Sequence, residues 1–147
     1  MAAKPGQSKR AEVGRSQEAR ARVLLVEDTE DNRFMMRRLL EMSGYRVAEA
    51  TNGAEAVRTA EYELPEIILM DLSLPIIDGL AATRRIRQLP ELKSVPIIAV
   101  SAHDTADFHA EALAAGCDAY VTKPIDYSEL EDLITLLLAK SKTDRAH

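Results

Sequence analysis

Four short apolar runs in this chain each end in polar residues that can take part in chemistry. The runs are separated by stretches long enough to form helices, and they cover residues 23–26, 67–70, 96–100 and 119–122. Short β-rich segments that alternate with helical stretches are typical of a parallel sheet, whose strands all finish at the same edge. The ends of the runs include Asp28, Asp71, Ser101 and Lys123. These side chains would therefore meet at one edge, where open α/β sheets place their sites.

The length and composition fit one soluble domain with a single core. The chain has 147 residues, of which 46% are hydrophobic and 29% charged. No apolar stretch approaches the ~20 residues of a membrane helix, and the beginning of the chain lacks the apolar segment of a secretory signal. Cys117 is the single cysteine, which excludes an intrachain disulfide. We therefore expect a cytoplasmic protein with Cys117 packed as a small apolar side chain.

The charge is unevenly distributed along the chain. The net charge is −5, yet residues 1–21 contain five basic and two acidic residues. The acidic remainder argues against a nucleic-acid partner. Because residues 1–21 are polar and show no apolar period, we expect a disordered basic leader there. One domain should follow at residues 22–140, and residues 141–147 should form a short polar tail.

The pattern predicts five strands, each followed by a helix. The first helix should run from residue 29 to 43, with Met35, Leu39, Leu40 and Met42 on its buried face and its arginines mostly solvated. Residues 45–50 alternate weakly, as an edge strand would. Asn52 should cap the second helix and Asp104 the fourth.

Three carboxylates, Glu27, Asp28 and Asp71, would lie close together at the predicted edge. Like charges ~4 Å apart repel by about 1 kcal/mol even in water, so the cluster needs a cation or protons. Oxygen ligands with room for water suit Mg²⁺. Singly, each residue also fits an ordinary loop position. Together with Ser101 and Lys123 they describe a phosphoryl site in which Asp71 is the nucleophile.

Four motifs give the chain a specific family resemblance. They are VLLVED at 23–28, ILMDLSLPIIDG at 68–79, IIAVSA at 97–102 and AYVTKP at 119–124. In this order and spacing, the chain from about residue 22 to 139 resembles a response-regulator receiver domain of two-component signalling, of the CheY-like type. The resemblance implies a doubly wound, flavodoxin-like α/β fold with strand order 2-1-3-4-5.

The resemblance also implies a role for each motif residue. Asp71 would be the phosphoacceptor, and Asp28, Asp71 and the carbonyl of Ser73 would bind Mg²⁺, with Glu27 contacting it through water. Ser101 and Lys123 would bind phosphoryl oxygens, helped by the backbone of Leu72 and Ala102. Ser101 and Tyr120 would form the switch, and Pro124 would follow a cis peptide bond. Ser73 and His103 would face the phosphoryl group and tune its lifetime.

The resemblance implies a phosphoacceptor that takes its phosphoryl group from a sensor histidine kinase or a phosphotransfer protein. It would catalyse only its own phosphorylation and dephosphorylation, and so would not be an enzyme acting on other substrates. It would signal by protein contact through the fourth helix, fifth strand and fifth helix, without nucleic acid or membrane.

Two other functions are weighed against this one. A Mg²⁺-dependent phosphohydrolase with an Asp nucleophile usually has a second Asp two residues later, where this chain has Ser73. A receiver-like module that binds partners without phosphorylation would not need the full set of site residues.

Overall fold

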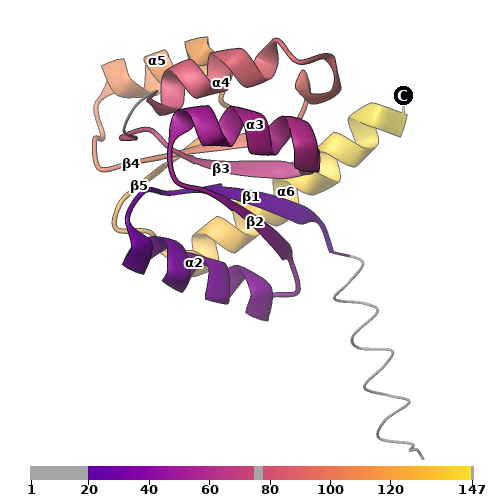
Figure 1. Cartoon of the computed structure of the whole chain (residues 1–147), viewed down its shortest axis with the longest axis horizontal. Coiled ribbons are helices and arrows are strands. Elements are labelled where there is room, and N and C mark those ends of the chain that lie inside the picture. Colours follow the sequence, from indigo (N-terminus) through magenta and orange to yellow (C-terminus); the bar gives the residue numbers. More distant parts are fainter. Residues whose placement is uncertain (1–19, 75–77, 147) are drawn as a thin grey trace, which may run out of the picture.

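The computed structural model describes residues 20–74 and 78–146, and these form a five-stranded parallel sheet covered by helices (Figure 1). The elements in chain order are β1 (Arg22–Val26), α2 (Glu30–Met42), β2 (Arg46–Ala50), α3 (Gly53–Glu63), β3 (Ile67–Asp71), α4 (Gly79–Arg87), the 3₁₀ turn η1 (Pro90–Leu92), β4 (Ile97–Ser101), α5 (Ala106–Ala115), β5 (Ala119–Thr122) and α6 (Tyr127–Ala146). The strand order is β2-β1-β3-β4-β5, which confirms the predicted fold.

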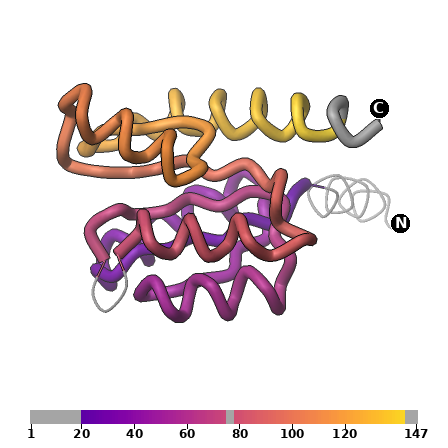
Figure 2. Tube along the Cα trace, turned by 90° about the horizontal axis from the view of Figure 1, so that it is seen from above, coloured from indigo at the N-terminus to yellow at the C-terminus, as the bar shows by residue number. Residues whose placement is uncertain are grey.

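The sheet separates two apolar layers. Helices α2 and α6 lie on one face, and α3, α4 and α5 lie on the other (Figures 1 and 2). Because side chains alternate along a strand, β1 contributes to both layers. Leu24 packs with Ala56 and Ile86 in one layer, while Leu25 packs with Leu40 and Ile134 in the other.

The strand register sets the position of the acidic residues. Val26 of β1 is paired with Met70 of β3, so Glu27 and Asp28 come next to Asp71 as the two strands end. All five residues of β3 are buried. On the other side of β3, Ser101 of β4 is paired with Thr122 of β5, which places Lys123 one step further on. The predicted meeting of strand ends is therefore confirmed.

Some helix details differ from the predictions. Thr105, not Asp104, caps α5, because its hydroxyl accepts a hydrogen bond from the Phe108 amide at 3.2 Å. Met35 and Met42 were expected on the buried face of α2 but are 62% and 71% exposed. Leu40, predicted on the same face, does point into the core and is fully buried.

Arg33 was expected to be mostly solvated, and it is not. Its side chain is 17% exposed and pairs with Glu49 of β2 at 3.0 Å. Its guanidinium also donates to the carbonyl of Glu27 at 3.1 Å. Arg37 joins the same carboxylate at 3.3 Å. Arg33 and Arg37 therefore attach this helix to the edge strand β2.

The C-terminal end of the chain differs from its prediction, and most of the N-terminal end lies outside the residues that the structure describes. Helix α6 continues to Ala146, so residues 141–146 extend the helix instead of forming a separate polar tail. This stretch contains neither Gly nor Pro to end the helix. Most of the predicted leader, residues 1–19, lies outside the described residues, as do residues 75–77 of the second motif.

Arg87 at the end of α4 joins three neighbouring segments. Its guanidinium donates to the carbonyl of Gly116 at 3.0 and 2.7 Å, and to the carbonyl of Leu92 at 3.0 Å. It also pairs with Asp118 at 2.9 Å. Gly116 has φ +115°, which suits glycine. The C-terminal end of α5 is thereby fixed to α4 and η1.

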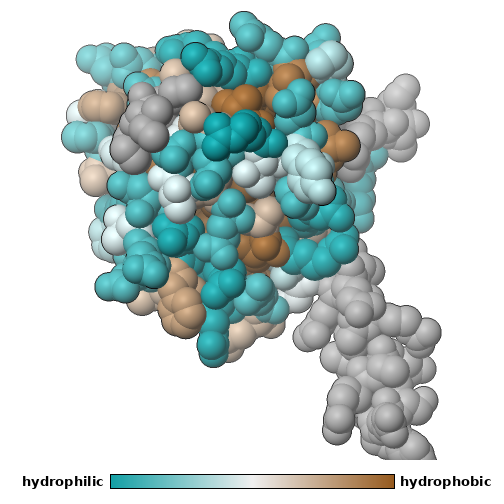
Figure 3. Space-filling model, in the orientation of Figure 1, coloured by the Kyte–Doolittle hydropathy of each residue, from teal (hydrophilic) through white to brown (hydrophobic). Residues whose placement is uncertain are grey.

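The molecular face drawn in Figure 3 is mostly polar, and apolar side chains reach it only in small, separate patches. Among the described residues, no helix is both long and apolar enough to cross a membrane.

Candidate functional site

Three carboxylates from two adjacent strand ends form the centre of the site. Glu27 and Asp28 follow β1, and Asp71 ends β3; one carboxylate oxygen of each lies within 4.8 Å of the others. Asp71 and Glu27 are buried, at 3% and 7% exposure, whereas Asp28 is exposed. Buried charges need compensating partners. The cluster can therefore hold a hard cation on its exposed side, and this oxygen-only donor set fits Mg²⁺.

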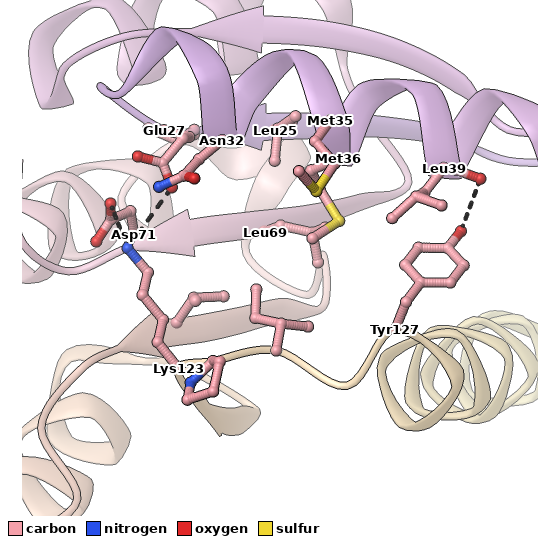
Figure 4. A pocket seen from close by; sticks show the side chains of 14 residues that line it. Leu25, Glu27, Asn32, Met35, Met36, Leu39, Leu69, Asp71, Lys123 and Tyr127 are labelled. Atoms are coloured by element: carbon pink, nitrogen blue, oxygen red, sulfur yellow. Dashed lines mark hydrogen bonds and ion pairs between the residues drawn. The ribbon is translucent and has the colours of Figure 1, made fainter.

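Lys123 supplies a positive charge from the loop after β5. Its ammonium group lies 3.3 Å from Asp71 Oδ2 and 3.6 Å from Glu27 Oε1 (Figure 4). Burial lowers the pKa of Lys123, but the charges of Asp71 and Glu27 and its hydrogen bonds to them outweigh that effect and raise it overall. Lys123 therefore stays protonated at neutral pH. The bond between Lys123 and Pro124 is cis, as predicted.

The surroundings of Glu27 disfavour the ionised form of its carboxyl group. Burial raises the pKa of Glu27, and the charges of Asp71 and Asp28 raise it further. The Thr29 amide, which donates to Glu27 Oε2 at 3.0 Å, and the charge of Lys123 act in the opposite direction. The net shift is upward, so the cluster carries unfavourable charge that a bound cation would relieve.

The Asp71 carboxylate is oriented at both of its oxygens. The Ser73 amide donates to Oδ1 at 2.9 Å, and Lys123 contacts Oδ2. Gly79 packs against the same backbone: a Cβ on it would lie 2.3 Å from the Asp71 carbonyl oxygen and 2.7 Å from the Leu72 Cα. A residue without a side chain at position 79 thus lets α4 begin directly against the end of β3.

The structure places some of the predicted phosphoryl-binding groups at the site and uses others elsewhere. Ser101 is 1% exposed and ends β4 beside Asp71, and Ala102 is exposed next to it. The Leu72 amide, predicted to face the phosphoryl group, instead donates to the Val100 carbonyl at 3.0 Å, because the β3–β4 ladder continues one residue beyond the strand. The amide that reaches the Asp71 carboxylate is that of Ser73.

The predicted switch residues are joined through the loop after β4. The Ser101 hydroxyl accepts from the His103 amide at 3.1 Å, and the Tyr120 hydroxyl donates to the His103 carbonyl at 2.7 Å. The His103 ring stacks on Phe108. Sequence reasoning missed His109, which stacks on Tyr120; Tyr120 lies eleven positions after His109, and no local pattern signals the contact.

An apolar cavity of about 400 Å³ opens beside Asp71 and Lys123, between α2 and the loop leading to α6 (Figure 4). Met35, Met36, Leu39 and Ile125 are among its lining residues. Tyr127 closes one side, with its hydroxyl donating to the Leu39 carbonyl at 3.0 Å. Met35, which is exposed on α2, thus forms part of the wall of this cavity.

A sequence model of the response regulator receiver domain matches residues 23–135. The chain belongs to the response-regulator receiver family. Among curated relatives, the polar-differentiation response regulator DivK of Brucella anthropi is 40% identical over 103 residues, which cover 70% of this chain and 84% of DivK. DivK of Brucella ovis is 39% identical over the same share of both chains.

Solved structures agree with this assignment to the receiver family. The receiver domain of sensor histidine kinase PA1611 from Pseudomonas aeruginosa is 37% identical and superposes with a TM-score of 0.77, covering 82% of this chain and 99% of that one. Its crystal structure has a magnesium ion coordinated in the active-site cleft. Chemotaxis protein CheY4 of Vibrio cholerae is 26% identical with a TM-score of 0.78, covering 81% of this receiver and 99% of CheY4.

Proposed function

We propose that this receiver takes a phosphoryl group onto Asp71 from a phosphohistidine of a sensor kinase or phosphotransfer protein. The single observation that carries the proposal is the position of Asp71: it is buried at the end of the central strand, with Lys123 on one carboxylate oxygen and two further carboxylates beside it. The receiver acts in the cytoplasm, catalyses only its own phosphorylation and dephosphorylation, and passes the signal on by protein contact through α5, β5 and α6.

In the transfer, an Asp71 carboxylate oxygen attacks the phosphorus, and the bond from phosphorus to the histidine nitrogen breaks. The electron pair of that bond stays with the departing imidazole. Lys123, which lies 3.3 Å from the Asp71 carboxylate, and the buried Ser101 hydroxyl would donate hydrogen bonds to the phosphoryl oxygens as their charge grows. Asp28, Asp71 and the Ser73 carbonyl would hold a magnesium ion, with Glu27 close by through water. That ion would supply positive charge to neutralise the phosphoryl oxygens.

The burial of Asp71 supports its role as nucleophile. Its carboxylate is held by the Ser73 amide and by Lys123, so it needs little reorientation before attack. Asp28 is exposed and has room for water, which suits a ligand of a partly hydrated magnesium ion. Asp71 would thus both attack the phosphorus and bind the metal, whereas Asp28 would serve as a metal ligand alone.

The test is phosphorylation by a small donor. The full chain is incubated with Mg²⁺ and acetyl phosphate and its intact mass is measured. We expect one added phosphoryl group, which is lost with EDTA and with Asp71→Asn. Asp78→Asn is the matched control, because Asp78 caps α4 in the loop after β3 and Asn is an equally good cap. A phosphoryl group retained by Asp71→Asn would overturn the proposal.

A further inference from the structure

Four rings connect the loop after β4 with the edge strand β5. His103 in the loop stacks on Phe108 of α5, with ring centroids 4.3 Å apart and planes inclined by 4°. His109 of α5 stacks on Tyr120 of β5, with centroids 3.9 Å apart and planes inclined by 21°. Consecutive residues of α5 therefore contact both the loop that follows Ser101 and the strand that carries Tyr120.

Tyr120 is held at two places. At its tip, the hydroxyl donates to the His103 carbonyl at 2.7 Å. On its face, the ring lies against the His109 imidazole. The His103 amide in turn donates to the Ser101 hydroxyl, so a single residue lies between Ser101 and the tip of Tyr120. We call this arrangement, with Tyr120 bonded to the loop, the docked arrangement.

The imidazole of His109 is itself oriented by the loop. Its Nε2 lies 2.9 Å from Asp104 Oδ1, while its ring face contacts Tyr120. The side chains of His109 and Asp104 are 43% and 65% exposed, so neither is a core residue. The contacts of His109 thus bear on the position of Tyr120 and of the loop more than on the packing of the core.

We propose that His109 is a positioning residue of the phosphorylation switch, which holds Tyr120 docked on the loop before a phosphoryl group is bound. The link to signalling rests on the proposed function of Asp71, whereas the docking itself does not need phosphorylation. A stacked aromatic pair changes an equilibrium by about 2- to 12-fold. Because His109 already favours the docked arrangement, the contact between the phosphoryl group and Ser101 needs to supply less free energy to complete the shift from undocked to docked molecules.

The test follows Tyr120 directly in the full chain. Fluorotyrosine is incorporated, and the ¹⁹F signal of Tyr120 is identified as the one missing from Tyr120→Phe. In EDTA, we expect His109→Ala to move this signal toward that of Tyr62, which is 85% exposed. With Mg²⁺ and the phosphoryl mimic beryllofluoride, the signal should return. The mimic concentration for half-saturation should rise by up to about 12-fold, since only docked molecules bind it well.

Three further variants separate positioning from a general structural effect. His109→Phe keeps a ring against Tyr120 and should restore the wild-type signal and half-saturation. Glu111→Ala, an exposed position on the same helix, should leave both unchanged. In a Tyr120→Ala background, His109→Ala should no longer change the half-saturation. If His109→Ala fails to fold, Asp104→Ala replaces it, because it frees the imidazole from the loop.

The proposal is overturned if His109→Ala has the wild-type Tyr120 signal and half-saturation. It is equally overturned if His109→Phe behaves like His109→Ala, or if the effect persists without the Tyr120 ring. Failure of the proposed function looks different. Wild-type protein would then take no phosphoryl group on Asp71, while the metal-free Tyr120 signal would still depend on His109.

Discussion

The Asp28→Asn variant should be more stable than wild type without magnesium and less stable than wild type with it. In the metal-free protein, the Asp28 carboxylate lies within 4.8 Å of those of Glu27 and Asp71. Each such pair repels by about 0.9 kcal/mol in water. Against this, an acid just before the N-terminus of α2 gains about 0.3–1 kcal/mol from the helix dipole. Repulsion wins, so Asp28→Asn should stabilise the metal-free protein by about 1 kcal/mol.

The order of stability of wild type and Asp28→Asn should invert when magnesium is added. Wild type at a hundred times its dissociation constant gains about 2.7 kcal/mol from the bound ion. Asp28→Asn lacks one direct ligand and should gain much less. For a domain of this size, a change of 1 kcal/mol corresponds to roughly 4 °C in the melting temperature. The variant should therefore melt about 4 °C above wild type in EDTA and below it in saturating Mg²⁺.

The assay is thermal unfolding followed by circular dichroism, with Glu61→Gln as the control for loss of an exposed acid on α3. In 1 M KCl the advantage of Asp28→Asn in EDTA should shrink, because the screening length falls to about 3 Å. The reasoning is refuted if Asp28→Asn is less stable than wild type in EDTA. Equal stabilisation of both proteins by Mg²⁺ would refute the assigned metal ligand.

Three other predictions follow from single contacts. Gly79→Ala should destabilise the fold by about 1–3 kcal/mol, since its Cβ would meet the Asp71 carbonyl, and should slow phosphorylation; unchanged unfolding and kinetics would contradict this. Burial raises the pKa of Cys117, so its thiolate is scarce at neutral pH, and native protein should react with a disulfide reagent far more slowly than unfolded protein. Ser101→Ala should accept the phosphoryl group on Asp71, yet with beryllofluoride its Tyr120 ¹⁹F signal should stay short of the wild-type docked position, because the hydrogen bond between Ser101 and the His103 amide is lost; a fully docked signal would show another route.

The sequence predicts the sheet and the acidic cluster because both follow from strand ends. Apolar runs rich in β-branched residues identify β1, β3 and β4, and a fourth run identifies β5. A parallel sheet brings the ends of these strands together whatever the helices do. For that reason, Asp28, Asp71 and Lys123 could be placed before any contact was known. The face of α2 could not be placed in the same way, since apolar residues occur around much of that helix.

Contacts between side chains that are far apart in the sequence cannot be predicted from strand ends or residue spacing. The Arg87 contacts to Gly116 and the stacking of His109 on Tyr120 join separate elements, and no spacing rule relates them. The choice of Thr105 over Asp104 as cap is of another kind. Both residue types cap helices well, so only the backbone decides which one does.

The hydrogen bonds from Arg87 to the Gly116 carbonyl limit how α5 can move. The far end of this helix is pinned by two hydrogen bonds to one carbonyl, while its near end begins in the exposed loop after Ser101. If a phosphoryl group drew Ser101 toward Asp71, α5 would therefore rotate about Gly116 instead of translating as a whole along the sheet. Displacement would be largest at Ala106 and vanish near Ala115. If the receiver signals through α5 as proposed, a partner that binds the first turn of this helix would respond most strongly to the switch.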